Sequence, residues 1–244
     1  MSNDHTKVEM PDSVHASEFP CNDGKSLFCL TPRGRNVDVH ALLQNNKEWL
    51  LDRLSNAGAI LLRGFQLNSP IDFQNAVYQL TQNFDSFDEE SSPRHIVEGV
   101  VQTSTDYPNK YPIQFHNEFS YSNSWPMKLF FYCHTPATEG GQTPIANSRR
   151  VLENIPDSIR ETFKNKGILY HRLYSPYVGV SWQKAFQTNS KSEVEQKCVK
   201  EDISIEWDKD QLRTFQWGSA ICEHPERKIP VWFNHGYFFN PNSL

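Results

Sequence analysis

A histidine and a glutamate stand two positions apart at His116 and Glu118, within the stretch IQFHNEFSYS. Residues two apart on a strand point to the same side, so this pair could present a nitrogen and a carboxylate oxygen to one ion. Two histidines and one carboxylate form the ligand set of non-heme Fe(II) oxygenases, which leaves three coordination positions open. Taken alone, the spacing is more typical of a surface pair at the end of a strand.

Short strands are the main elements that the sequence predicts around this pair. Apolar or alternating runs predict the strands, and capping residues with terminal glycines predict the helices. The predicted strands are 59–65, 127–135, a segment within 140–148, 168–174, one strand within the loop 85–112, and two hairpins at 203–217 and 219–235. The predicted helices are 45–58, 69–84, 155–167 and 190–202. Many short strands with few helices indicate a β-rich barrel or jelly roll.

The 244 residues are enough for one large domain or two small ones. Residues 1–20 contain no apolar core of a secretory signal, and we expect a flexible tail there. We expect a single domain over residues 21–244. The chain has no run of 18 apolar residues, so the sequence predicts no membrane span.

Charge and cysteine content exclude several classes of protein. The net charge of −5 comes without a basic stripe, which argues against a nucleic-acid partner. The five cysteines are odd in number and form no Cys-x-x-Cys pair, so disulfide scaffolds and zinc ribbons are disfavoured. A reducing, cytoplasmic location is therefore predicted.

Four stretches carry a resemblance to a known family. They are SSPRHIVEGVVQTSTDYPNKYPIQFHNEFSYSNSWP, LFFYCHTPATEGGQTPIANSRRVLENIP, GVSWQKAF and VWFNHGYFF. With them the chain, from residue 59 to its last residue, resembles the taurine dioxygenase-like (TauD/TfdA) Fe(II)/2-oxoglutarate-dependent oxygenases. The branch that it resembles includes the clavaminate synthase-like and syringomycin-pathway hydroxylase-like enzymes.

The resemblance implies a fold and a reaction. The fold would be a double-stranded β-helix, or jelly roll, mainly β with flanking helices. His116 and Glu118 fall on the first two iron ligands, and Thr143 falls on the threonine that hydrogen-bonds 2-oxoglutarate. Fe(II), 2-oxoglutarate and O2 would oxidise a C–H bond of a small amino- or carboxylate-bearing substrate, free or attached to a carrier protein. Hydroxylation, desaturation and cyclisation share these ligands, whereas halogenation would need Ala or Gly at position 118.

Four further residues are candidates for substrate binding, each with a structural alternative. Arg94 could pair with a carboxylate or form a structural salt bridge. Asn117 lies between the two residues of the pair and Ser120 shortly after it, and both could also orient the pair through hydrogen bonds. Tyr121 could line a cleft or belong to the core. The same core-or-cleft choice applies to Trp125, Trp182 and Phe186, and His134 is expected to be a core histidine.

The resemblance also implies a second histidine and a later arginine that binds the far carboxylate of 2-oxoglutarate. No such pair occurs up to Leu244. We therefore expect a jelly roll that is incomplete at its C-terminal end, as a fragment, a shortened relative or a chain completed by a partner. His235 is expected near the cleft rather than on the metal, and His224 and Arg227 in an exposed turn.

Three functional hypotheses remain open from the sequence. The first is the oxygenase, with a role in secondary metabolism. The second is a catalytically degenerate homologue that serves as a non-catalytic binding module. The third is a sugar-binding jelly roll, which only the six tryptophans suggest.

Overall fold

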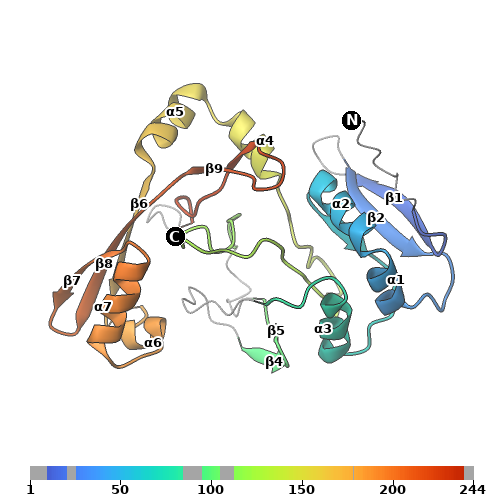
Figure 1. Ribbon diagram of the computed structural model, residues 1–244, viewed down its shortest axis with the longest axis horizontal. Helices are drawn as coiled ribbons and strands as arrows, with labels where there is room; N and C mark the ends of the chain where they lie inside the picture. The colour runs from blue at the N-terminus through green and yellow to red at the C-terminus, as the bar shows by residue number, and fades with distance from the viewer. Residues whose placement is uncertain (1–9, 21–25, 85–94, 105–112, 178, 239–244) are drawn as a thin grey trace, which may run out of the picture. The chain divides into compact units, whose positions relative to one another are not determined.

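The computed structural model describes residues 10–20, 26–84, 95–104, 113–177 and 179–238. Within them the chain forms two compact units (Figure 1). The first unit holds the described residues up to Phe84 together with His95–Thr103 and Phe130–Ala137, and the second unit holds the others. Arg94, one of the candidate substrate-binding residues, lies outside the described residues.

A three-stranded sheet forms one layer of the first unit. Strand β1 (Val14–Pro20) pairs antiparallel with β2 (Ser26–Pro32), and β2 pairs in parallel with β3 (Ile60–Leu62). Residues 14–20 are therefore a strand, and the expectation of a flexible tail is wrong for this part. The reason is that Val14 is a core residue with no exposed surface. The flexible tail was inferred from the lack of a secretory signal, and that lack does not show whether a residue packs in the core. The strand predicted at 59–65 is confirmed as the shorter β3.

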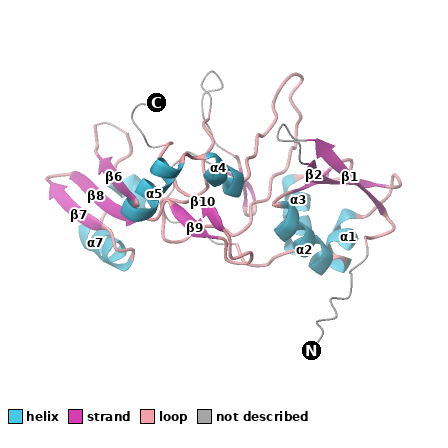
Figure 2. Ribbon diagram, turned by 90° about the horizontal axis from the view of Figure 1, so that it is seen from above, coloured by secondary structure: helices cyan, strands magenta, loops and turns pink. Residues whose placement is uncertain are grey.

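Three helices form the second layer, on one side of this sheet (Figure 2). They are α1 (Val39–Asn45), α2 (Lys47–Ala57) and α3 (Pro70–Tyr78). Helix α2 ends where predicted, because Gly58 adopts a left-handed φ of 82° that closes its last turn. Helix α3 begins at the predicted cap, where the Ser69 hydroxyl accepts a hydrogen bond from the Asp72 N–H at 3.1 Å.

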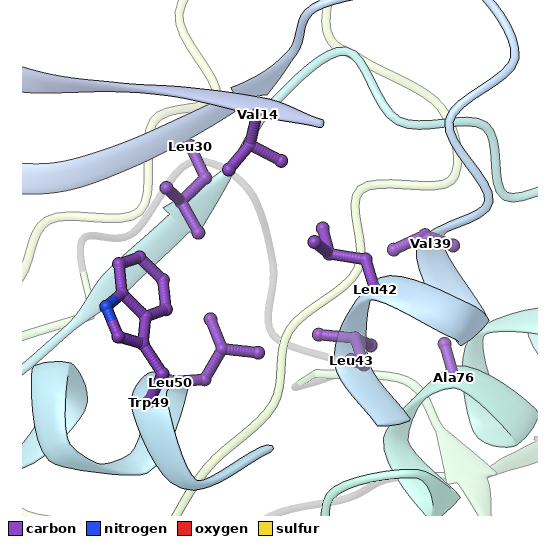
Figure 3. Close-up of a cluster of buried hydrophobic side chains, with 8 residues drawn as sticks. All are labelled: Val14, Leu30, Val39, Leu42, Leu43, Trp49, Leu50 and Ala76. Atoms are coloured by element: carbon purple, nitrogen blue, oxygen red, sulfur yellow. The ribbon is translucent and has the colours of Figure 1, made fainter. Parts of the chain in front are cut away.

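The core of the first unit lies between these layers (Figure 3). Val14 and Leu30 come from the sheet and meet apolar side chains of all three helices. The Trp49 ring packs edge-on against Phe28, with ring centroids 5.8 Å apart. The buried cluster comprises Val14, Leu30, Val39, Leu42, Leu43, Trp49, Leu50 and Ala76.

A hairpin of two short strands, β4 (Ile96–Glu98) and β5 (Val101–Gln102), adjoins α3. The Gln74 side chain accepts a hydrogen bond from the Val100 N–H at 2.8 Å and ties the hairpin to α3. The sequence predicted one strand within 85–112, and the described part of that range contains two.

A second three-stranded sheet organises the other unit. Its strands are β6 (Ile168–Tyr174), β7 (Ser204–Asp208) and β8 (Gln211–Gly218), in the antiparallel order β6-β8-β7. The predicted strand at 168–174 and the predicted hairpin at 203–217 are both confirmed. Gly167 allows β6 to start close to β8, because a Cβ at this position would lie 2.7 Å from the Gly218 carbonyl oxygen.

Helices α6 (Trp182–Phe186) and α7 (Lys191–Lys200) pack against this sheet (Figure 1). The predicted cap of α7 is confirmed, since the Ser190 hydroxyl accepts a hydrogen bond from the Glu193 N–H at 3.3 Å. The buried cluster comprises Trp182, Ala185, Phe186, Val194, Cys198, Ile203 and Leu212.

The remaining elements of the second unit surround a short hairpin. Strands β9 (Ile221–Glu223) and β10 (Pro230–Trp232) confirm the predicted hairpin at 219–235. Helix α4 (Ser148–Asn154) packs against β10. Helix α5 (Asp157–Lys166) confirms the predicted helix at 155–167, and its Phe163 packs edge-on against Trp232.

Two predicted strands are wrong. Residues 127–135 form no strand, and Leu129 and Phe131 are 52% and 68% exposed. The alternation of partly buried and exposed side chains along this segment does fit an extended chain. A strand, however, also needs a neighbouring strand for its backbone hydrogen bonds, and an apolar run does not identify one. Residues 140–147 are likewise not a strand and lead into α4.

Four small sheets therefore form within the described residues, and the jelly roll and the single domain stay predictions. Among the described helices, none is both long and apolar enough to cross a membrane. The four described cysteines, Cys29, Cys133, Cys198 and Cys222, are free thiols. The cytoplasmic location also stays a prediction.

Candidate metal site

His116 and Glu118 converge although they do not lie on a strand. Residues 113–117 have no regular secondary structure, and a turn begins at Glu118. Phe119 adopts a left-handed φ of 55° in this turn, a conformation that is rare for an aromatic residue. The turn brings the Nε2 atom of His116 to 3.4 Å from the Oε2 atom of Glu118. The sequence thus predicted the convergence of the two side chains but not the backbone that produces it.

The His116 ring is oriented by its own backbone. Its Nδ1 atom lies 2.8 Å from the Gln114 carbonyl oxygen. Because a carbonyl only accepts, Nδ1 carries the proton and Nε2 is left unprotonated in the neutral ring. Metal-binding histidines use the same arrangement, in which a carbonyl fixes the tautomer and the other nitrogen binds the ion.

The two facing atoms suit a bound cation. In the neutral tautomer the Nε2 atom of His116 and the Oε2 atom of Glu118 both offer an electron pair to a positive ion, whereas a protonated His116 would form an ion pair with Glu118 at the same distance. Two bonds of roughly 2.1 Å that meet at about a right angle span roughly 3 Å, close to the observed separation. The side chains are 28% and 19% exposed, so an ion could reach them.

A second imidazole lies beside the first. The ring of His235 is 5.4 Å from that of His116, centroid to centroid, and His235 is only 4% exposed. Burial lowers the pKa of His235 to about 4, with a further contribution from His116, so this ring is neutral at pH 7. His235 was expected near the cleft rather than on the metal, and the structure places its ring against that of His116.

Asn117 and Ser120 use their polar groups inside the protein. The Asn117 amide donates to the Trp232 carbonyl at 3.1 Å. Its side-chain oxygen accepts from the Ser148 hydroxyl at 3.3 Å. Ser120, which is 8% exposed, donates its hydroxyl to the Asn117 carbonyl at 2.8 Å. These bonds fit the orienting role considered for both residues, and substrate binding by them stays a prediction.

Two residues of β6 support the turn, and sequence reasoning missed both. Arg172 donates to the Tyr121 carbonyl and to the Gln216 side chain, both at 3.1 Å, and its guanidinium lies over the Tyr121 ring. Tyr170 accepts a hydrogen bond from the His235 N–H at 2.9 Å, and burial raises the pKa of its hydroxyl. The alternation of the predicted strand 168–174 places both residues on one face and could have identified them.

The other candidates take varied positions. Tyr121 is 4% exposed and belongs to the buried side of the turn. Thr143 lies on the exposed segment that precedes α4. Trp182 and Phe186 are core residues, so of the two alternatives considered, core or cleft, the core is confirmed. His134 is exposed, so the expectation of a core histidine is wrong. It followed from the strand wrongly predicted at 127–135.

The described part of the chain contains no group of three or more His, Cys, Asp or Glu residues arranged to hold a metal ion. Within this part of the chain, His116 and Glu118 therefore form a pair of potential donors, and His235 does not complete a group of three with them.

Comparison with known proteins decides the family. The family described as "Taurine catabolism dioxygenase TauD, TfdA family" matches residues 25–243. The chain belongs to this family. It is 41% identical over 192 residues to the dapdiamide synthesis protein DdaC of Enterobacter agglomerans, an alignment that covers 78% of this chain and 58% of DdaC. It is 32% identical over 229 residues to a clavaminate synthase-like protein of Arabidopsis thaliana, covering 84% of this chain and 68% of that protein.

Proposed function

We propose that this TauD, TfdA family chain acts as an Fe(II)/2-oxoglutarate-dependent oxygenase whose metal is held by His116 and Glu118. The observation that carries the proposal is the 3.4 Å approach of Nε2 and Oε2, with the Nδ1 atom of His116 held 2.8 Å from the Gln114 carbonyl so that Nε2 is the nitrogen left to face an ion. The membership of the family supports the same assignment.

The proposed reaction consumes one O2 and one 2-oxoglutarate for each substrate. One oxygen atom enters a C–H bond as a hydroxyl group, and the other enters 2-oxoglutarate, which loses CO2 and becomes succinate. A bound ferrous ion supplies the oxygen chemistry. The chain supplies two ligands for the ion, and the Thr143 hydroxyl would donate a hydrogen bond to a carboxylate of 2-oxoglutarate.

The substrate proposed is a small molecule with an amino or carboxylate group, either free or attached to a carrier protein. The relative DdaC is named for dapdiamide synthesis, which supports a role in the synthesis of a small molecule. Hydroxylation is the proposed outcome. Glutamate at position 118 argues against halogenation, because its side chain fills the place that a chloride ligand would need.

The test is an anaerobic titration with Fe(II) and 2-oxoglutarate, followed through the visible charge-transfer band of a metal-bound 2-oxo acid. The unaltered chain should develop the band. His116→Ala and Glu118→Gln should lose it, whereas His171→Ala, which removes an exposed histidine of β6, should keep it. A full-strength band in His116→Ala would reject the site.

A non-catalytic binding module is the second candidate. The observation in its favour is that the described residues offer only two clustered metal donors rather than a complete group. Succinate formation in air distinguishes the two functions. A chain that develops the band but releases no succinate, with or without candidate substrates, would be a binding module.

A further inference from the structure

His235 contacts the metal-binding turn at the peptide between its two donors. Its Nδ1 atom lies 3.0 Å from the carbonyl oxygen of Asn117, the residue between His116 and Glu118. The same nitrogen lies 3.2 Å from the Ser120 hydroxyl oxygen. Since a carbonyl only accepts, Nδ1 of His235 is the protonated nitrogen and donates to this pair of oxygens.

The Asn117 carbonyl accepts hydrogen bonds both from within the turn and from His235. It accepts from the Ser120 N–H at 3.2 Å and from the Ser120 hydroxyl at 2.8 Å, in addition to His235. This carbonyl belongs to the peptide that leads directly into Glu118. Fixing its direction therefore fixes the course of the backbone from which the carboxylate projects.

The turn needs such a restraint because it is strained. Phe119, directly after Glu118, has a φ of 55°. Left-handed backbone at a residue other than glycine costs about 1–3 kcal/mol and persists where surrounding contacts determine it. The contacts here come from β10 and the segment after it, since the Trp232 carbonyl accepts from the Asn117 side-chain amide and His235 holds the Asn117 carbonyl.

His235 is itself held in place from the sheet. Its N–H donates to the Tyr170 hydroxyl at 2.9 Å. The following residue, Gly236, donates its N–H to the Asn234 side chain at 3.0 Å and packs so closely that a Cβ there would lie 2.9 Å from Ile168. Both Tyr170 and Ile168 belong to β6, so the restraint on the turn extends to the sheet of the second unit.

We propose that His235 is a positioning residue, which holds the Asn117 peptide through its Nδ1–H and thereby keeps the His116 and Glu118 donors convergent without binding the metal itself. This inference rests on the proposed metal site. In this proposal His235 orients the residues that bind the metal and is not itself a ligand.

The test compares two replacements of His235 in the full chain, with Co(II) as the metal probe. His235→Asn retains an N–H near the position of Nδ1, and His235→Leu retains much of the volume without a donor. Loss of residues that orient metal ligands typically weakens metal binding by about 10–100-fold, and we expect a loss of that size for His235→Leu. For His235→Asn we expect binding within about threefold of the unaltered chain, since its amide restores the donor.

Control variants separate the possible failures. His171→Leu removes a histidine from the exposed face of β6 and should leave Co(II) binding unchanged. Ser120→Ala removes the other side-chain donor to the Asn117 carbonyl and should weaken binding less than His235→Leu. The thermal unfolding of each variant is also measured, which identifies any variant that does not fold. If His235→Leu does not fold, the comparison rests on His235→Asn and Ser120→Ala.

The outcomes decide between distinct readings. Equal losses in His235→Asn and His235→Leu would overturn the proposal in favour of His235 as a metal ligand. Unaltered binding in His235→Leu would also overturn it while leaving the metal site intact. If His116→Ala binds Co(II) like the unaltered chain, the proposed function itself fails, whatever His235 does.

Discussion

The Nδ1 atom of His235 lies 3.0 Å from the carbonyl oxygen of Asn117, although 118 positions separate the two residues in the chain. This contact joins the segment that follows β10 to the turn that carries both proposed metal donors. The geometry of the candidate site therefore depends on residues close to the end of the described chain as well as on the local His-x-Glu spacing.

A larger side chain at Gly236 should disturb the contact between His235 and the Asn117 carbonyl. We expect Gly236→Ala to lower the free energy of unfolding by about 1 kcal/mol, because its Cβ would lie 2.9 Å from the Cδ1 atom of Ile168 and 3.2 Å from the Oδ1 atom of Asn234, so both side chains must shift. Metal affinity should fall slightly as well, because the shift of Asn234 moves its chain neighbour His235. Chemical denaturation and Co(II) titration measure the two effects. Gly34→Ala is the matched control, since its Cβ would meet nothing within 4 Å.

Arg172 should contribute to the stability of the same turn. Replacing it with methionine removes the donors to the Tyr121 carbonyl and to Gln216 and leaves both acceptors in a partly buried setting. The expected loss is about 1–3 kcal/mol in the free energy of unfolding. Arg213→Met on the neighbouring strand β8 is the control, and an equal loss in both variants would contradict the assigned role of Arg172.

The sequence was informative where local chemistry decides the structure. Ser69 and Ser190 cap the helices that they were predicted to cap, and Gly58 ends its helix, because each acts on backbone groups within a few residues. The convergence of His116 and Glu118 was predicted for the same reason. The strand that was predicted to produce this convergence is not present. The convergence is still found, because a turn can also bring residues two apart to one side.

Long-range relationships were beyond the sequence. The apolar run at 127–135 has the composition of a strand but forms none, because strand formation depends on a neighbour that the run itself does not specify. Likewise, nothing near His235 indicates that its ring meets a carbonyl 118 positions earlier. The alternation of the predicted strand 168–174 places Tyr170 and Arg172 on one face, but only the folded chain shows that this face meets Tyr121 and His235.

Thr143 provides a test of the co-substrate site that is independent of the metal donors. Thr143→Val keeps the shape of the side chain and removes its hydroxyl. If this hydroxyl donates to 2-oxoglutarate, the dissociation constant of 2-oxoglutarate should rise about tenfold, the equivalent of about 1.4 kcal/mol for one hydrogen bond to a charged group. Co(II) binding without 2-oxoglutarate should not change. Thr138→Val, in the same exposed segment, should alter neither constant, and an unchanged response in Thr143→Val would remove Thr143 from the site.

Asp72 should make the first unit sensitive to acid. Its Oδ2 atom accepts from the Asn68 N–H at 3.0 Å, and its Oδ1 atom lies 2.7 Å from Nε2 of His40 on α1. The hydrogen bond from Asn68 is the largest cause that lowers the pKa of Asp72 below its ordinary value of 3.8, and His40 adds to it. Because the folded chain holds the proton less tightly than the unfolded chain, the carboxylate contributes stability above the unfolded pKa. That contribution is lost as the pH falls through the folded pKa.

Asp72→Asn should therefore cost about 1 kcal/mol at pH 7, as expected for a partly exposed charged hydrogen bond. The difference from the unaltered chain should shrink as the pH falls below 3.8 and the native carboxyl takes up its proton. Hydrogen exchange of the α1 and α3 amides at several pH values measures it within the first unit. Asp52→Asn, on the exposed side of α2, serves as the control. A destabilisation by Asp72→Asn that stays constant from pH 7 to well below 3.8 would show that the charge of Asp72 is not what links the two helices.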